Sequence, residues 1–147
     1  MPSIDTHRLG TVEYSEESVL EFPVGLPAFD SDTRFILVER PDLAPVIFLQ
    51  SLVHADLCFF AVPAECVDPS FTLRAPDEEL ALLGDAAPNP GDLLCLALLT
   101  FREEQPPTAN MMGPVVIHRG TRRGRQIIQY DSGYSFEYPL EAQEEPC

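Results

Sequence analysis

Residues 22–30, Phe22-Pro23-Val24-Gly25-Leu26-Pro27-Ala28-Phe29-Asp30, combine two prolines and a glycine with large apolar side chains. Proline fixes φ and lacks an amide donor, and glycine tolerates positive φ, so this stretch predicts a loop of defined shape and not a helix or a strand. Loops normally keep large apolar side chains out of water. Phe22, Leu26 and Phe29 therefore either fill the core of the domain or form an apolar surface for a partner.

The rest of the chain predicts an all-β fold, mainly antiparallel. Short runs of β-branched and aromatic residues alternate with Pro, Gly, Asp and Asn, which is typical of antiparallel strands joined by tight turns. We expect three hairpins, made by residues 10–14 with 19–22, 34–39 with 46–51, and 115–119 with 125–130. Single strands are expected at 57–62, at 70–73 and, from the alternation of Tyr134, Phe136 and Tyr138, at the end of the chain.

Two further segments carry weaker patterns. Residues 93–100 are almost all apolar and rich in leucine and alanine, which suits a helix, but their short length and the preceding Pro88-Asn89-Pro90-Gly91 favour a buried strand. Pro76 at a first helical position, the acidic residues after it and Gly84 as a stop predict a short helix over 76–83. We expect this helix to cap an open end of the sheet.

The length of 147 residues fits one domain, taken as residues 1–140, and the acidic residues 141–147 are expected to form a disordered tail. The longest apolar run, 93–99, is too short to cross a bilayer. Neither a signal-peptide layout nor paired cysteine spacing is present, so free thiols and a cytoplasmic location are expected. The four cysteines are Cys58, Cys66, Cys95 and Cys147.

The formal net charge is −15, from 24 acidic residues against nine basic ones, and all nine are arginines. This charge opposes binding to nucleic acid or to an anionic membrane, and it favours encounter with a basic protein surface. Solubility alone is the other explanation of the charge. Four of the arginines lie in the turn Arg119 to Arg125, which either grips an anion or is a solvated hairpin tip.

Motifs of catalysis and cofactor binding are missing from the sequence. His7, His54 and His118 are far apart, and the cysteines lack the close pairs of a zinc site, so we expect no metal. Ser51 is close to His54, but it is not part of a Gly-x-Ser-x-Gly nucleophile elbow. No glycine-rich phosphate loop precedes a helix. We therefore expect a protein that is not an enzyme and that uses no cofactor.

Three motifs occur in a fixed order along the chain: Phe-Pro-x-Gly-Leu-Pro-x-Phe at 22–29, Phe48-Leu49-Gln50-Ser51, and the stretch from Thr108 to Ile117 that contains Asn110-Met111-Met112-Gly113-Pro114. Together they resemble the FliW family of flagellar assembly factors. The sequence departs from the family pattern at Ala28, where glycine is usual, at Met111, where leucine is usual, and at His118, where asparagine is usual.

The resemblance implies a noncatalytic, cytoplasmic protein with a small, flattened β-barrel-like fold. One or two short helices and a monomeric state are also expected. It implies two protein partners: flagellin before export, and the translational regulator CsrA, a basic RNA-binding dimer. Binding would antagonise CsrA repression of flagellin messenger RNA without occupying the surface of CsrA that contacts RNA. The alternative is a flagellin-specific chaperone without CsrA regulation. Direct binding to nucleic acid or membrane is not expected.

Partner-binding residues are expected within the three motifs: Phe22, Pro23, Gly25, Leu26, Pro27, Phe29, Gln50, Ser51, Asn110, Met111 and Pro114. Gln50 either satisfies neighbouring backbone groups or contacts a partner. Asn110 either pins the turn before Pro114 or binds the backbone of a docked peptide. Ala28 implies a negative φ or room for a methyl group, Met111 an apolar pocket, and His118 a titratable group at a turn.

Overall fold

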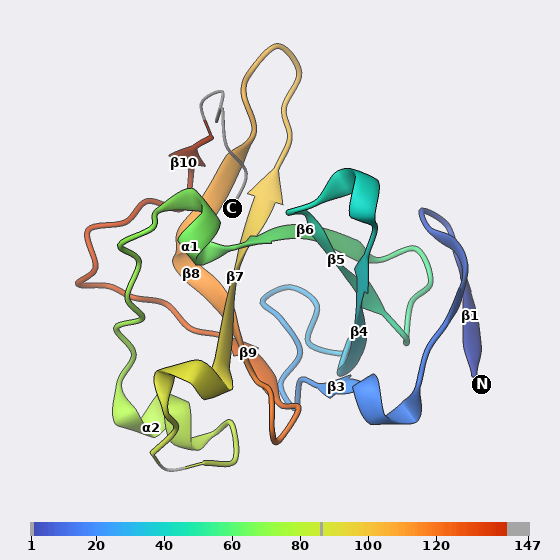
Figure 1. The fold of residues 1–147 in the computed structure, drawn as a ribbon, viewed down its shortest axis with the longest axis horizontal. Helices are drawn as coiled ribbons and strands as arrows, with labels where there is room; N and C mark the ends of the chain where they lie inside the picture. Colours follow the sequence, from blue (N-terminus) through green and yellow to red (C-terminus); the bar gives the residue numbers. More distant parts are fainter. Residues whose placement is uncertain (1, 86, 141–147) are drawn as a thin grey trace.

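One curled antiparallel sheet makes up most of the fold (Figure 1). The computed structural model describes residues 2–85 and 87–140. The strands of this sheet are β3 (Leu20–Glu21), β4 (Arg34–Glu39), β5 (Ile47–Ser51), β6 (Cys58–Pro63), β7 (Leu93–Thr100), β8 (Thr108–His118), β9 (Gly124–Gln126) and β10 (Tyr138–Pro139). Their order is β10-β8-β7-β6-β5-β4-β3, and β9 also pairs with β8. The predicted antiparallel all-β fold is confirmed, as are the strand over 93–100 and the hairpin of β4 with β5.

The sheet closes nearly into a barrel because its first strand reaches the turn after β8. The amide of Glu21 donates to the carbonyl of Arg122 at 2.8 Å, and a parallel bridge joins Glu21 to Arg123. Behind this seam the ring of Phe22 lies against Gly124, where a Cβ atom would come within 2.5 Å of the Phe22 Cζ atom. Position 124 therefore has no room for a side chain.

Apolar side chains from both ends of the chain fill the barrel. The largest cluster joins the 22–33 loop to β3–β8 and contains Leu20, Phe22, Leu26, Phe35, Ile47, Leu49, Ala61, Leu96, Val115 and Ile117. A second cluster, which includes Met111 and Ala97, lies under α1 (Ala64–Val67). Burial of this kind removes apolar surface from water and supplies most of the favourable free energy of folding.

The chain begins with a separate two-stranded sheet beside the barrel, made of β1 (Ser3–Thr6) and β2 (Gly10–Glu13) (Figure 1). The expected hairpin of residues 10–14 with 19–22 is therefore wrong. The residues between them form the 3₁₀ helix η1 (Glu16–Ser18), whose first turn is capped by the Ser15 hydroxyl. This turn leads the chain away from β2 and into the barrel.

Two of the expected strands are extended coil that packs through side chains. Residues 70–73 form no strand; instead, the amide of Arg74 donates to Gln129 Oε1 at 2.7 Å. The last strand is limited to β10, and Tyr134 before it donates its hydroxyl to Asp68 at 2.6 Å. Side-chain partners distant in sequence replace the expected ladder bonds in both places.

The helix predicted over 76–83 is confirmed in shorter form as α2 (Asp77–Ala81), but Pro76 is its N-cap and not its first helical residue as expected. Leu83 after it is fully buried with Val116 and Ile127, which fastens α2 to the outside of the sheet. Two further 3₁₀ turns, η2 (Pro41–Leu43) and η3 (Pro90–Asp92), join strands. Within the described ranges, no helix is long and apolar enough to span a membrane.

The cysteines differ from expectation in one respect. Cys58 and Cys95 are free, as predicted, but Cys66 is disulfide-bonded, so the prediction of free thiols throughout is wrong. Sequence spacing did not indicate this bond. Cys147 and the tail expected at 141–147 lie outside the described residues.

Candidate functional site

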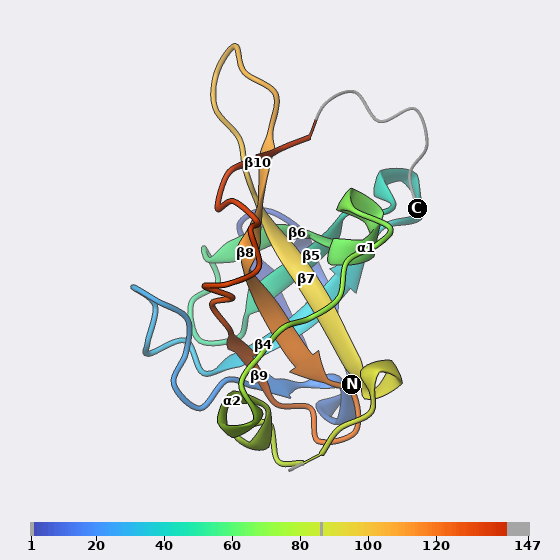
Figure 2. The same cartoon turned by 90° about the vertical axis from the view of Figure 1, so that its left-hand side faces the viewer.

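The 22–33 loop projects from the barrel between β3 and β4 (Figure 2). Phe22 is fully buried and Leu26 is 3% exposed, so these two side chains fill the core. The backbones of Leu26 and Phe29 exchange hydrogen bonds across the tip. Gly25 has φ +65°, and a Cβ atom there would lie 2.4 Å from the Phe29 carbonyl oxygen. The predicted loop of defined shape is present, and it is held from inside the barrel.

Several apolar residues of this loop face solvent, and we call four of them the loop face: Pro23, Val24, Pro27 and Phe29. Val24 is 57% exposed and Phe29 is 37% exposed. The Phe29 ring meets Phe59 edge-on, with centroids 5.4 Å apart, so its orientation is fixed. The two readings of the loop thus apply to different residues: some side chains fill the core, and others form an exposed apolar surface.

Ala28, at the tip of the loop, has φ +71°. This is the left-handed region that L residues disfavour, so the expectation of a negative φ is wrong. The side chain is exposed, so the methyl group itself has room. The conformation is the one that the glycine usual at this position adopts without strain.

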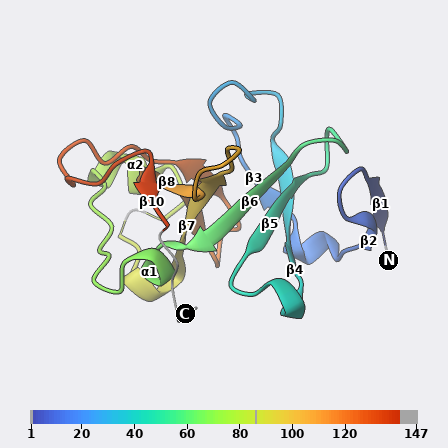
Figure 3. The ribbon, with the colours of Figure 1, turned by 90° about the horizontal axis from the view of Figure 1, so that it is seen from above.

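A buried carboxylate ties the loop to the 52–57 turn between β5 and β6, and the two segments lie side by side in Figure 3. Asp32 is 2% exposed, and its Oδ1 accepts from the Ser51 hydroxyl at 2.6 Å and binds His54 Nδ1 at 2.8 Å. The hydrogen bond to Asp32, followed by its charge, raises the pKa of His54. Asp32 was not singled out from the sequence, because nothing local marks it as the partner of residues 51 and 54.

This trio is not a catalytic triad. The Ser51 hydroxyl donates to Asp32 and not to His54, and its oxygen accepts from the amides of Val53 and His54 at 3.0 Å each. A serine nucleophile instead needs its proton on a histidine that the carboxylate orients from the other side. Ser51 therefore organises the turn.

Gln50 supports the same turn from below. It is fully buried, and its Nε2 donates to the carbonyls of Ser51 at 2.9 Å and Ala55 at 3.3 Å. Of the two roles expected for Gln50, these bonds match the satisfaction of neighbouring backbone groups. Neither Gln50 nor Ser51 exposes its side chain, so both act on the surface through the turn that they hold.

The third motif forms a large bulge in β8. Leu96 pairs with Val115 and Leu98 pairs with Asn110, so the single β7 residue between them faces the four residues 111–114. Asn110 Oδ1 accepts from the Gly113 amide at 2.8 Å and closes the bulge, which matches the role of pinning the turn before Pro114. Met111 is fully buried, as the expected apolar pocket requires.

Gln126 joins the bulge to the loop. Its Nε2 donates to the Gly113 carbonyl at 2.7 Å, and the same residue lines a cavity of about 220 Å³ with Arg125 and the loop residues 24–28. The end of β5 and the β8 bulge are therefore both linked to the loop, so the three sequence motifs meet around it. Sequence order alone could not show this, because the connecting residue belongs to β9.

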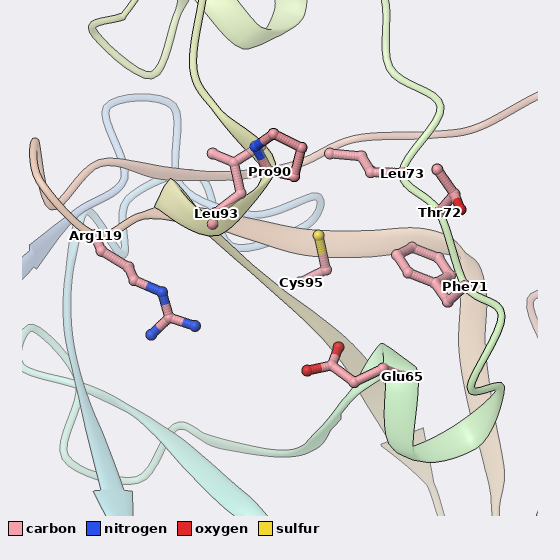
Figure 4. Close-up of a pocket in the computed structure, with 9 residues that line it drawn as sticks. Glu65, Phe71, Thr72, Leu73, Pro90, Leu93, Cys95 and Arg119 are labelled. Carbon is pink, nitrogen blue, oxygen red and sulfur yellow. The ribbon is translucent and has the colours of Figure 1, made fainter.

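The largest of the described cavities lies elsewhere, with a volume of about 450 Å³ (Figure 4). Figure 4 shows Cys95 between Arg119 on the left and Phe71 on the right, with Glu65 of α1 below it. Burial raises the pKa of the Cys95 thiol to about 11, so it is not a thiolate at neutral pH. No sequence motif indicated this cavity, since its lining comes from four separate segments.

Asp85, Asp92 and His118 bring potential metal ligands within 4.8 Å of one another. His118 Nδ1 accepts from the amides of Gly120 at 3.0 Å and Thr121 at 3.1 Å, so Nε2 carries the proton and donates to Asp85 at 3.0 Å. That hydrogen bond lowers the pKa of Asp85. Both ring nitrogens are engaged, and His118 caps the turn where an asparagine is usual.

Known proteins are similar to this chain over almost its whole length. The sequence profile of the family described as "FliW protein" matches residues 3–140. A flagellar assembly factor FliW of Syntrophomonas wolfei is 30% identical over 132 residues, which cover 90% of this chain and 84% of the relative. The corresponding protein of Azoarcus sp. is 34% identical over 130 residues, which cover 85% and 89%.

The fold agrees as well. A crystal structure of the flagellar assembly factor FliW superposes with a TM-score of 0.85 at 26% sequence identity. The match covers 98% of this chain and all of the other chain.

Proposed function

Because the chain belongs to the FliW family of flagellar assembly factors, we propose that it binds two proteins in the cytoplasm, flagellin and the translational regulator CsrA. Flagellin would be bound before export. Binding to CsrA would relieve its repression of flagellin messenger RNA without covering the surface of CsrA that contacts RNA. Flagellin that accumulates would take the protein away from CsrA, and flagellin synthesis would fall.

The observation that carries this proposal is the loop face. Its apolar side chains are exposed on a backbone whose interior residues are locked into the core, so little conformational entropy is lost when a partner binds. The terminal segments of flagellin are disordered before assembly and amphipathic when helical, and an amphipathic helix needs an apolar surface of this kind. The flanking cavities extend that surface on both sides.

Charge supports CsrA as the second partner. With a net charge of −15, the chain attracts a basic RNA-binding protein and repels the RNA itself. Attraction of this kind acts mainly on the rate of encounter and weakens with salt. The two partners thus depend on different properties of the surface, apolar area for flagellin and charge for CsrA.

The predicted partner-binding residues divide into two roles in this proposal. Pro23, Pro27 and Phe29 would contact the partner directly, with Val24 added to them. The others would shape the surface from beneath: Phe22, Gly25, Leu26, Gln50, Ser51, Asn110, Met111 and Pro114.

Substitutions at exposed sites test this division without disturbing the core. Val24→Asp should weaken flagellin binding at least tenfold, because the carboxylate would have to be desolvated against an apolar partner. Leu43→Asp is the matched control, since Leu43 is 46% exposed on η2, outside the loop face. Equal binding by both variants, with folding intact by circular dichroism, would remove the loop face from the proposal.

Calorimetry against CsrA and flagellin from the same organism, at low and moderate salt, tests the function itself. Binding to both, with salt weakening CsrA more, supports the exchange of partners. Binding to flagellin alone favours a flagellin-specific chaperone. Absence of binding to either partner would mean that this chain shares the fold of the family and not its interactions.

A further inference from the structure

A cavity of about 300 Å³ opens between the 22–33 loop and the 52–57 turn. Phe29, Asp32, His54, Asp56 and Leu57 contribute to its lining. Its apolar wall continues the loop face, and its polar side carries acidic groups. The bonds of Asp32 to Ser51 and His54 fix the two segments that form it, so the cavity is preformed.

Asp32 offers this cavity a carboxylate oxygen without a hydrogen-bond donor. Its side chain is 3% exposed, and both of its hydrogen bonds use Oδ1. No described residue donates to Oδ2. Oδ2 is not sealed from solvent, so a ligand that enters the cavity and donates hydrogen bonds can reach it.

The surroundings favour a cation over a neutral donor. Asp56 is exposed at the rim, and its charge acts on His54 together with that of Asp32. These two carboxylates are the charged groups that face His54 from the loop and from the turn. With His54 neutral, the cavity has two negative charges and no positive one.

The apolar wall selects a cation with an apolar or planar body. Phe29 exposes part of its ring, and Leu57 is half-buried beside it. An aromatic face attracts a guanidinium group, and the alkyl stem of a long basic side chain packs against apolar surface. A guanidinium group also carries several donors in one plane, enough for both carboxylates at once.

We propose that this cavity binds the side chain of an arginine presented by a basic protein partner. The guanidinium group would donate to Asp32 Oδ2 and Asp56, and its stem would lie against Phe29. The net charge of −15 draws such a partner to the molecule. The identity of the partner rests on the proposed function, whereas the affinity of the cavity for a guanidinium group does not.

Binding should depend on pH, because a guanidinium group and a protonated His54 are alternative sources of positive charge beside Asp32. Protonation of His54 places a cation next to the guest and repels it. Affinity should therefore fall as the pH is lowered through the pKa of His54. A purely apolar contact would not respond in this way.

The first experiment uses a small probe and the whole chain. N-acetyl-arginine amide is titrated at millimolar concentrations while the NMR signals of Phe29, His54 and Asp56 are followed, with N-acetyl-citrulline amide as the uncharged isostere. Saturable shifts at these residues with the arginine probe alone are expected. Absence of such shifts, or equal shifts with citrulline, would overturn the proposal.

The second experiment measures CsrA binding by calorimetry for Asp56→Asn and Asp30→Asn. Asp30 is exposed on the same loop but lines a different cavity, with Arg125 and Gln126. Each variant removes one negative charge, so a difference between them reports on the position of the carboxylate and not on the net charge. Asp56→Asn should weaken binding about fivefold and Asp30→Asn much less. Equal losses would show that only net charge matters and would overturn the assignment of the partner residue. If the arginine probe binds but the unmodified chain does not bind CsrA, the cavity stands and the proposed function fails.

Discussion

At the scale of single residues, two positions carry unusual conformations or bonds at the loop. Ala28 adopts a positive φ without being glycine, and His54 shares a buried carboxylate with Ser51. The first could not be predicted, because a local sequence does not fix the sign of φ at an alanine. The second depends on Asp32, which is separated from residues 51 and 54 by a whole strand and is brought to them only by the pairing of β4 with β5.

His54 should make stability depend on pH. Asp32 raises the pKa of His54 in the folded state above its ordinary value of 6.5. The stabilising contribution of His54 is therefore complete below pH 6.5 and is lost as the pH rises through the folded-state pKa. His54→Gln should therefore lower the midpoint of thermal unfolding most near about pH 6 and least near about pH 9. His7→Gln, at another exposed histidine, is the control. Parallel curves for the unmodified chain and His54→Gln would contradict this linkage.

Ala28→Gly should stabilise the protein. Glycine removes the cost of a left-handed conformation, which is about 1–2 kcal/mol for an L residue. Part of this gain is lost, because glycine also gives the unfolded chain more conformational entropy. A net gain of about 0.5–1 kcal/mol in the free energy of unfolding is expected, measured by urea denaturation. Ala28→Val should lower stability by a larger amount. A loss of stability in Ala28→Gly would mean that the methyl group makes a contact that outweighs the strain.

At the scale of elements, the sequence patterns predicted where strands lie better than which strands pair with each other. The hairpin of β4 and β5 followed from alternation around a proline-rich turn, and 93–100 followed from its apolar length. The β1–β2 pair was missed because three of the four residues 3–6 are polar, so the segment lacks the apolar pattern of a strand. The bulge in β8 could not be inferred from its motif, because Gln126 of β9 and the carbonyl of Ser135 complete its hydrogen bonds.

The barrel seam should be sensitive to a single methyl group. Gly124→Ala would place a Cβ atom within 2.5 Å of the buried Phe22 ring, which has no space to move away. We expect a loss of about 1–3 kcal/mol in the free energy of unfolding, the range for an overpacked core. Gly91→Ala is the matched control, because a Cβ atom there meets nothing within 4 Å. Similar stability of the two variants in urea denaturation would show that the seam relaxes easily.

At the scale of the whole molecule, charge and closure work against each other. A net charge of −15 on a small, nearly closed barrel disfavours the compact state through repulsion, while the core and the seam hold it together. The sequence predicted the fold class and the motifs of the candidate site. The cavities beside the loop required the structure, since each is lined by segments that meet only when the barrel closes.

Salt should therefore stabilise this protein while it weakens attraction to a basic partner. Raising sodium chloride from about 20 to about 300 mM shortens the Debye length from about 20 Å to about 6 Å and screens repulsion among the carboxylates. The urea midpoint should rise, with the slope of the transition unchanged. Potassium chloride at the same ionic strength should act equally. A midpoint that falls with either salt would show that attractive ion pairs outweigh the repulsion.

The contact of Phe22 with Gly124 also bears on how relatives of this protein can diverge. The two positions lie near opposite ends of the chain, yet the ring of one occupies the space that a side chain at the other would need. Neither residue is free to change alone. Across homologous chains the two positions should covary, with glycine at 124 wherever 22 is aromatic and a larger residue at 124 only where 22 has become smaller.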